Sequence, residues 1–231
     1  IYTDVDGVYT ADPRIVPHAH KMEEVTYDEM LEMASLGAKV LHSRCVEIAK
    51  KYGVELLVCS SLNRNSGTMV REKTKMEKML ISGVAADKNV AKIRVAGLGN
   101  DPESTFRLLN LLDRNNLNID VMIQSLGKDG TKSVSFTVAK PDMLRTIDVL
   151  NDNKNSLGIK KLDYDENVAK VSVIGAGVRS HSGVAAKMFG ALANAGINTE
   201  MVTTSEIRIT ALIDEAYADQ AMRAIHETFL E

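Results

Sequence analysis

Apolar runs and amphipathic stretches alternate along the chain and predict a mixed α/β protein. Apolar runs rich in β-branched residues, which are typical of strands, occupy residues 54–60, 90–96 and 168–174. Amphipathic stretches, in which apolar residues recur at helical spacing, follow the second and third of these runs. The pattern therefore predicts strands and helices that alternate along the chain.

The stretch before the first apolar run carries clear helix signals. Thr26 followed by Glu29 is a capping box, which predicts a helix that starts at Tyr27. Gly37 is expected to interrupt this helix, and Gly53 to cap the end of a second helix that begins near residue 38. The apolar face expected for the second helix consists of Leu41, Cys45, Ile48 and Ala49.

A repeat is the strongest organisational signal in the sequence. Residues 87–99 match residues 165–177, and residues 117–125 match residues 197–205. Each copy predicts the element order strand, helix, strand, strand, helix. Before them, residues 63–80 are polar and charged without clear periodicity, which favours a linker.

The second copy ends without the final strand that residues 159–165 supply to the first. Residues 81–87 hold the same place before the first copy that residues 159–165 hold before the second. A sheet that lacked this strand would expose unpaired backbone groups at its edge. We therefore expect residues 81–87 to complete the second unit, so that the first βαββαβ unit is inserted within the second.

Composition narrows the classes of function. The net charge of −3 and the aromatic content of 4% give no basic or stacking surface for nucleic acid. No apolar run is long enough to span a bilayer, and no signal peptide is evident, so a cytoplasmic protein without a membrane partner is expected. The two cysteines, Cys45 and Cys59, are expected to be buried reduced thiols.

Each repeat offers groups that can bind an amino acid. Asp101, with Pro102 at the first helical position, and Ser180 or Ser182 in the second copy are expected to cap helix N-termini, which favour an anion. The stretches 118–120 and 198–200 place amide and carboxylate oxygens nearby, where they can accept from an ammonium group. Ordinary helix caps and strand-end turns remain the alternative interpretation.

The opening loop, residues 3–14, concentrates charge next to glycine and proline. Its glycine follows the aspartates too early for an EF-hand loop, and no closing glutamate follows. His18 and His20 lack a third ligand, so no metal site is expected. The chain also lacks a glycine-rich phosphate loop and a recognisable nucleophile motif.

The segments TDVDGVYTADPR, GAKVLH and GAGVRSHSGVAAKMFGALANAGIN, with the closing helix, closely resemble the aspartokinase family over essentially the whole chain. This family phosphorylates L-aspartate with ATP to give 4-phospho-L-aspartate, the first step of lysine, threonine and methionine biosynthesis. The resemblance implies part of an αβα amino-acid-kinase domain followed by two ferredoxin-like ACT domains. The expected bounds are 1–62 for the kinase part, 63–80 for a linker, 88–165 for the first ACT domain, and 81–87 plus 166–231 for the second.

The resemblance also implies two sets of binding residues. ATP, with Mg²⁺ as the counter-ion of its phosphates, is expected at Thr3, Asp4, Tyr9, Arg14 and Lys39. The effector is lysine, threonine or both, bound between the ACT domains of a homodimer or higher oligomer. The effector residues that the resemblance implies are Asn100, Asp101, Asn118, Ile119, Asp120 and Gln124, with Asn198, Thr199 and Ser205.

Several positions depart from the family pattern. Asn100 stands where many relatives carry aspartate, Glu103 where they carry glycine, and Ser182 where proline is usual. The family's lysine-glycine-glycine phosphate motif and its aspartate-binding residues are not in this sequence. No complete catalytic set is therefore expected, and the chain alone should be inactive. The alternative is a stand-alone amino-acid-binding regulatory subunit without a catalytic role.

Overall fold

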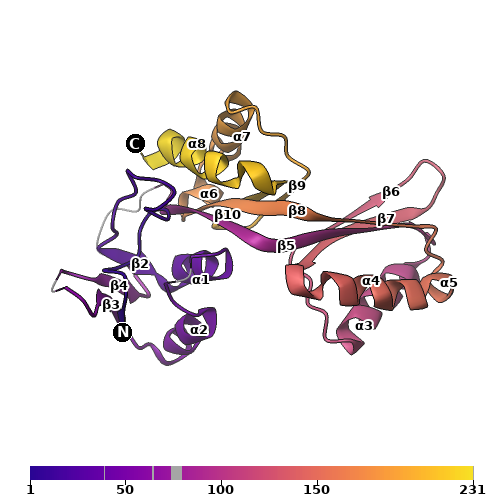
Figure 1. The fold of residues 1–231 in the computed structure, drawn as a ribbon, viewed down its shortest axis with the longest axis horizontal. Coiled ribbons are helices and arrows are strands. Elements are labelled where there is room, and N and C mark those ends of the chain that lie inside the picture. The colour runs from indigo at the N-terminus through magenta and orange to yellow at the C-terminus, as the bar shows by residue number, and fades with distance from the viewer. Residues whose placement is uncertain (39, 64, 74–79, 231) are drawn as a thin grey trace. The chain divides into compact units, whose positions relative to one another are not determined.

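A computed structural model describes residues 1–38, 40–63, 65–73 and 80–230. The chain divides into two compact units, Ile1–Lys88 with Lys170–Glu231, and Asn89–Ala169 (Figure 1). Within the described ranges, no helix combines the length and the apolar character that crossing a membrane requires.

A four-stranded sheet with two helices forms the N-terminal part of the first unit. Its strand order is β1-β3-β4-β2, with β1 parallel to β3, β2 parallel to β4, and β3 antiparallel to β4. The elements are β1 (Tyr2–Thr3), β2 (Glu24–Thr26), α1 (Tyr27–Ser35), α2 (Ser43–Tyr52), β3 (Leu56–Ser60) and β4 (Thr68–Arg71). Strand β4 lies inside the stretch expected as a linker, and Thr68 and Val70 on it are buried.

Helix α1 begins where the capping box predicts. The Thr26 hydroxyl accepts from the Glu29 backbone N–H at 3.3 Å, and the Glu29 carboxylate accepts from the Thr26 backbone N–H at 3.2 Å. The helix ends at Ser35, and Gly37 follows with a φ of 106°, a conformation that favours glycine. The start of α1 and its interruption near Gly37 are thus confirmed.

Helix α2 differs from the prediction at its start and in its buried face. It begins at Ser43, because the side chain of His42 caps it by accepting from the Arg44 backbone N–H. Its end at Gly53, with a φ of 64°, is confirmed. The expected apolar face is wrong in two positions: Cys45 is exposed and Ile48 is 49% exposed, while Val46 packs inward beside Ala49. Cys45 is therefore not the buried thiol that was expected.

The remainder of the first unit contains the β5-β8-β10-β9 part of a six-stranded sheet, covered by helices. Its core contains Val171, Val173, Met188, Leu192 and Ile225. The elements are β5 (Gly83–Leu98), β8 (Lys161–Ile174), α6 (Gly177–Ser180), α7 (Val184–Asn194), β9 (Met201–Thr204), β10 (Arg208–Asp214), η2 (Glu215–Tyr217) and α8 (Ala218–Leu230). β9 and β10 are antiparallel.

The second unit repeats this plan with strand order β6-β7-β5-β8. Its core contains Ile93, Leu108, Leu112, Phe136 and Leu150. β7 is antiparallel to both β5 and β6. The additional elements are α3 (Pro102–Arg114), β6 (Met122–Leu126), β7 (Lys132–Ala139), η1 (Lys140–Asp142), α4 (Met143–Asp152) and α5 (Lys154–Leu157).

Strands β5 and β8 each contribute to both units, because one six-stranded sheet of order β6-β7-β5-β8-β10-β9 contains all of these strands. The pattern predicts two strands in place of each, but the polar residues between them, such as Asn89 and Asn167, do not end the strand, and neither stretch contains proline. The last strand of each βαββαβ pattern comes from a different element in the two units. In the first unit it is the N-terminal part of β5, and in the second unit it is β8. The insertion of the first repeat within the second stays a prediction.

Candidate functional site

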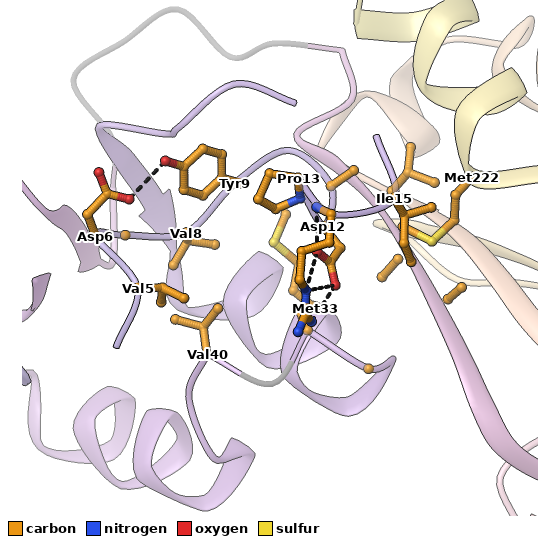
Figure 2. Close-up of a pocket in the computed structure, with 18 of the residues that line it drawn as sticks. Val5, Asp6, Val8, Tyr9, Asp12, Pro13, Ile15, Met33, Val40 and Met222 are labelled. Atoms are coloured by element: carbon orange, nitrogen blue, oxygen red, sulfur yellow. Dashed lines mark hydrogen bonds and ion pairs between the residues drawn. The ribbon is translucent and has the colours of Figure 1, made fainter. Parts of the chain in front are cut away.

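The opening loop lines a cavity of about 690 Å³ in the first unit. Figure 2 shows the loop side chains around it, with Met33 of α1 and Met222 of α8 also contributing. Three of the side chains expected to contact a nucleotide, those of Asp4, Tyr9 and Arg14, belong to the lining. The fold therefore brings these three residues together around one concave surface.

Arg14 is held by a carboxylate two residues before it. Its Nε lies 3.0 Å and its Nη2 2.7 Å from the two carboxylate oxygens of Asp12, and the Arg14 backbone N–H donates to the same carboxylate at 2.9 Å. This two-point contact lowers the pKa of Asp12 and raises that of Arg14. The Arg14 side chain remains 85% exposed, so its cationic group is both oriented and accessible.

Tyr9 is held in the same way by a second aspartate. Its hydroxyl donates to Asp6 Oδ1 at 2.8 Å (Figure 2), which lowers the pKa of Asp6 and raises that of Tyr9. The other oxygen of Asp6 accepts from Asn65 Nδ2 at 3.3 Å and lies 3.6 Å from Lys21 Nζ. The Tyr9 ring is thus fixed by its hydroxyl at the wall of the cavity.

Asp6 and Asp12 are not among the residues that the sequence predicts for this site. Spacing alone gives a weak signal for them, since an aspartate two or three residues from an arginine or tyrosine is common in loops. The contacts show what each carboxylate does, because each one orients a side chain with a predicted nucleotide role. Asp4, Asp6 and Asp12 all line the cavity, and Asp6 and Asp12 in addition hold the side chains of Tyr9 and Arg14.

Two predicted nucleotide residues stand apart from this arrangement. Thr3 is not part of the cavity lining; its hydroxyl donates to Asp4 Oδ1 at 3.0 Å, so it touches the site through Asp4. Lys39 lies outside the described residues. The nucleotide roles of all five residues stay predictions.

The base of the loop is fixed by Thr68 on β4. The Thr68 hydroxyl accepts from the Val8 backbone N–H at 2.8 Å and donates to the Met22 carbonyl at 2.6 Å. Gly7 sits directly beside it with a φ of 151°, and a Cβ there would come within 2.6 Å of the Thr68 hydroxyl oxygen. The loop therefore needs glycine at this position. Within the described ranges, no group of three or more His, Cys, Asp or Glu side chains is placed to hold a metal ion.

In the second unit, part of the predicted effector set gathers at the N-terminus of α3. Asp101 occupies the expected N-cap position with Pro102 after it, but its side chain makes no capping hydrogen bond. Gln124 of β6 accepts from the Thr105 hydroxyl at 2.7 Å, and Lys132 Nζ donates to the Asp101 carbonyl at 2.8 Å. Asn100 precedes this cluster and is exposed.

The stretch Asn118, Ile119 and Asp120 lies elsewhere in the same unit. The Asp120 backbone N–H donates to the Thr137 carbonyl at 3.1 Å, and Thr137 is five residues beyond Lys132 on β7. Five residues of strand span about 17 Å. Asp120 is therefore bonded to β7 five residues along the strand from Lys132, whose side chain contacts Asp101.

The corresponding residues of the second repeat belong to the first unit. Asn198 and Thr199 are exposed just before β9, and the Ser205 backbone N–H donates to the Arg208 carbonyl at 2.8 Å. The predicted serine caps are wrong, because Ser180 ends α6 and Gly183 occupies the N-cap position of α7, so neither Ser180 nor Ser182 caps that helix. The effector roles of all nine residues stay predictions.

Two sequence profiles define the class of protein. Residues 1–60 match the amino acid kinase family, and residues 171–229 match the ACT domain. Together with the two βαββαβ sheets, these matches describe part of an amino-acid kinase joined to a regulatory ACT module.

Known proteins narrow this class to one family. Aspartokinase from Pseudomonas aeruginosa is 43% identical over 99% of this chain. A chain from a crystal structure of aspartokinase alpha and beta subunits is 42% identical, with 64% of this chain and 98% of that one aligned and a TM-score of 0.61. E. coli aspartokinase III in complex with aspartate and ADP aligns with 100% of this chain and 52% of its own, at 27% identity and a TM-score of 0.88. The chain belongs to the aspartokinase family.

The same E. coli enzyme in complex with lysine and aspartate aligns with a TM-score of 0.80. This chain spans 56% of the length of the P. aeruginosa relative.

Proposed function

We propose that this chain is the C-terminal and regulatory portion of an aspartate kinase. The whole protein would transfer the γ-phosphoryl group of ATP to the side-chain carboxylate of L-aspartate and form 4-phospho-L-aspartate, in the cytoplasm. The observation that carries the proposal is the identity to an aspartokinase over 99% of the chain. The match of residues 1–60 to the amino acid kinase family favours this role over a stand-alone sensor.

The geometry of the opening loop supports a nucleotide role. Arg14 presents an exposed guanidinium with a fixed direction, as neutralising a phosphate requires. Asp4 presents an exposed carboxylate that can accept from ribose or base, with Thr3 bonded to it and Tyr9 beside them. Lys39 would add a second cation. Mg²⁺ would enter with ATP as the counter-ion of its phosphates.

We assign the regulatory role to the ACT units, with lysine, threonine or both as effectors. E. coli aspartokinase III is known in complex with lysine, and 100% of the present chain aligns with that structure. The separation of Asp101 from Asp120 within one unit supports a site completed by a second copy, and hence a homodimer. Effector binding would favour an arrangement with weaker substrate binding.

A chimera tests the catalytic part of the proposal. The N-terminal segment of P. aeruginosa aspartokinase that precedes the aligned region would be fused to residue 1, and ADP release would be measured with and without L-aspartate. We expect aspartate-dependent turnover by the chimera and none by the 231-residue chain alone.

The matched control is Arg14→Ala in the same chimera, which should fold equally well and turn over much more slowly. A chimera whose thermal unfolding is cooperative but which releases no ADP in response to aspartate would contradict the proposal. Aspartate-dependent turnover by the isolated chain would contradict the claim that the chain is catalytically incomplete.

A further inference from the structure

The segment at residues 9–16, which includes the end of the opening loop, is anchored in the core of the C-terminal sheet and helices of the first unit. Ala11 and Val16 are only 5% and 3% exposed and belong to the same hydrophobic cluster as Met222 and Ile225 of α8. The loop therefore packs against residues near the C-terminus as well as against its neighbours in sequence. Its apolar side chains are packed among those of the last regulatory helix.

A buried hydrogen bond adds a polar link at the same place. Thr10 is 3% exposed and His226 of α8 is fully buried, and the Thr10 hydroxyl oxygen lies 2.9 Å from His226 Nε2. The Thr10 hydroxyl also accepts from the His20 backbone N–H at 3.0 Å. The Thr10 carbonyl accepts from the Val84 backbone N–H of β5 at 2.7 Å. Thr10 is thus bonded to three segments that are distant in sequence.

The hydroxyl of Thr10 has the capacity for both of its contacts. A hydroxyl offers one proton and two lone pairs, and the His20 N–H occupies one lone pair. The proton and the second lone pair remain, so the contact with His226 Nε2 forms with either tautomer of the imidazole. Because both side chains are buried, loss of the imidazole would leave the hydroxyl without this partner in a place that water does not reach.

Thr10 lies between the two oriented side chains of the loop. Tyr9 is its immediate neighbour, and Asp12, which holds Arg14, follows two residues later. A shift of the Thr10 backbone would therefore move the Tyr9 ring and the Asp12–Arg14 pair together. Arg223 of α8 makes a longer contact just beyond the loop, since its Nη1 donates to the Ile15 carbonyl at 3.4 Å.

We propose that His226 is a positioning residue for the nucleotide loop and acts through Thr10. The inference rests on the proposed function only for the nature of the ligand, an adenine nucleotide at Tyr9 and Arg14. It goes further in giving a residue of the regulatory part a role at that site. The bond provides a direct route by which a displacement of α8 changes the nucleotide loop.

Amide hydrogen exchange on the 231-residue chain tests the positioning itself. In His226→Phe, which keeps a ring but removes its nitrogens, the amides of Thr10 and Arg14 should exchange about tenfold faster. The amide of Ser82, bonded to the Ile174 carbonyl, reports on the sheet and should not change. Thr228→Val alters an exposed hydroxyl on the same helix that bonds only to the Ala224 carbonyl, and it should change none of these rates.

Two further variants separate positioning from a general loss of structure. His226→Gln retains a polar group at a similar distance and should restore slow exchange at Thr10. Thr10→Val removes the other partner, so it should speed exchange at Arg14 on its own and add little to His226→Phe. Unchanged exchange at Thr10 and Arg14 in a folded His226→Phe, or in Thr10→Val if the former does not fold, would overturn the proposal.

Nucleotide affinity gives a second and independent result. The dissociation constant for Mg·ADP should rise about tenfold in His226→Phe and stay near the wild-type value in Thr228→Val and His226→Gln. Binding by wild type that His226→Phe leaves unchanged would also overturn the proposal. If the wild-type chain binds no Mg·ADP, the proposed nucleotide role is what fails, and the exchange rates alone then decide whether His226 positions the loop.

Discussion

Asp12 holds the guanidinium of Arg14 by two side-chain contacts, at 3.0 and 2.7 Å, while the arginine remains largely exposed to solvent. An exposed ion pair of this kind adds little to stability, because water screens both charges. The Asp12–Arg14 pair instead fixes the direction of the cationic group before any ligand binds. In a nucleotide site, a preset arginine loses less conformational freedom on binding than a freely rotating one.

Asp12→Asn should therefore weaken nucleotide binding more than it weakens the fold. The asparagine keeps the size of the side chain but removes the charge that orients Arg14, so we expect about a tenfold higher dissociation constant for Mg·ADP. Calorimetric titration and a thermal melt of the same sample measure the two effects. Asp148→Asn, an exposed change in the second unit, is the control and should alter neither. A tenfold loss of affinity in Asp148→Asn, or none in Asp12→Asn, would contradict this role.

Tyr9 should ionise at a higher pH than an ordinary tyrosine. Its hydroxyl donates to the Asp6 carboxylate, which raises the pKa of Tyr9 above its usual 10.0, because ionisation would lose the hydrogen bond and place two negative charges together. NMR of ¹³C-labelled tyrosine rings follows the titration of each ring, and Tyr9→Phe assigns the signal. Asp6→Asn should bring the pKa back towards 10.0.

The same shift predicts a pH dependence of loop stability. Because the pKa of Tyr9 is raised in the folded state, its contribution is fully present below pH 10.0 and is lost as the pH rises through the folded pKa. A Tyr9 that titrates at or below the usual pKa of 10.0 would show that the bond to Asp6 does not form in solution.

Gly37→Ala should destabilise the first unit substantially. The φ of 106° is unfavourable for alanine, and its Cβ would lie 2.2 Å from the Ala86 carbonyl oxygen, so the backbone must move. We expect a loss of about 2–4 kcal/mol in the free energy of unfolding, measured by urea denaturation. Gly190→Ala is the matched control: apart from its chain neighbours and the backbone of its own helix, no atom lies within 4 Å of the added methyl, and alanine favours the helix by about 0.5–1 kcal/mol. Equal stability of Gly37→Ala and wild type would contradict the packing described for Gly37.

The elements predicted best from sequence are those that local chemistry determines. The capping box at Thr26 and Glu29 and the glycine at 53 act within a single turn, so their signals do not depend on the rest of the fold. The repeat predicted the order of elements along each copy, strand, helix, strand, strand and helix, because the two copies share one pattern.

Features set by tertiary contacts could not be predicted in this way. His42 carries no strong helix-start signal, so the start of α2 at Ser43 and its inward residue Val46 were missed. The contact between Thr10 and His226 joins residues 216 positions apart, and no local pattern marks either one. Among the site residues, a resemblance suggests Arg14, whereas only the contact shows that Asp12 orients it.

Binding of an amino acid by the ACT units is the central claim, and calorimetric titration of the 231-residue chain with L-lysine, L-threonine and the two together tests it most directly. We predict saturable heat from at least one of these titrations, strongly reduced in Asp120→Ala and unchanged in Asp148→Asn. A folded chain that gives no heat of binding with lysine, threonine or their mixture would contradict the account.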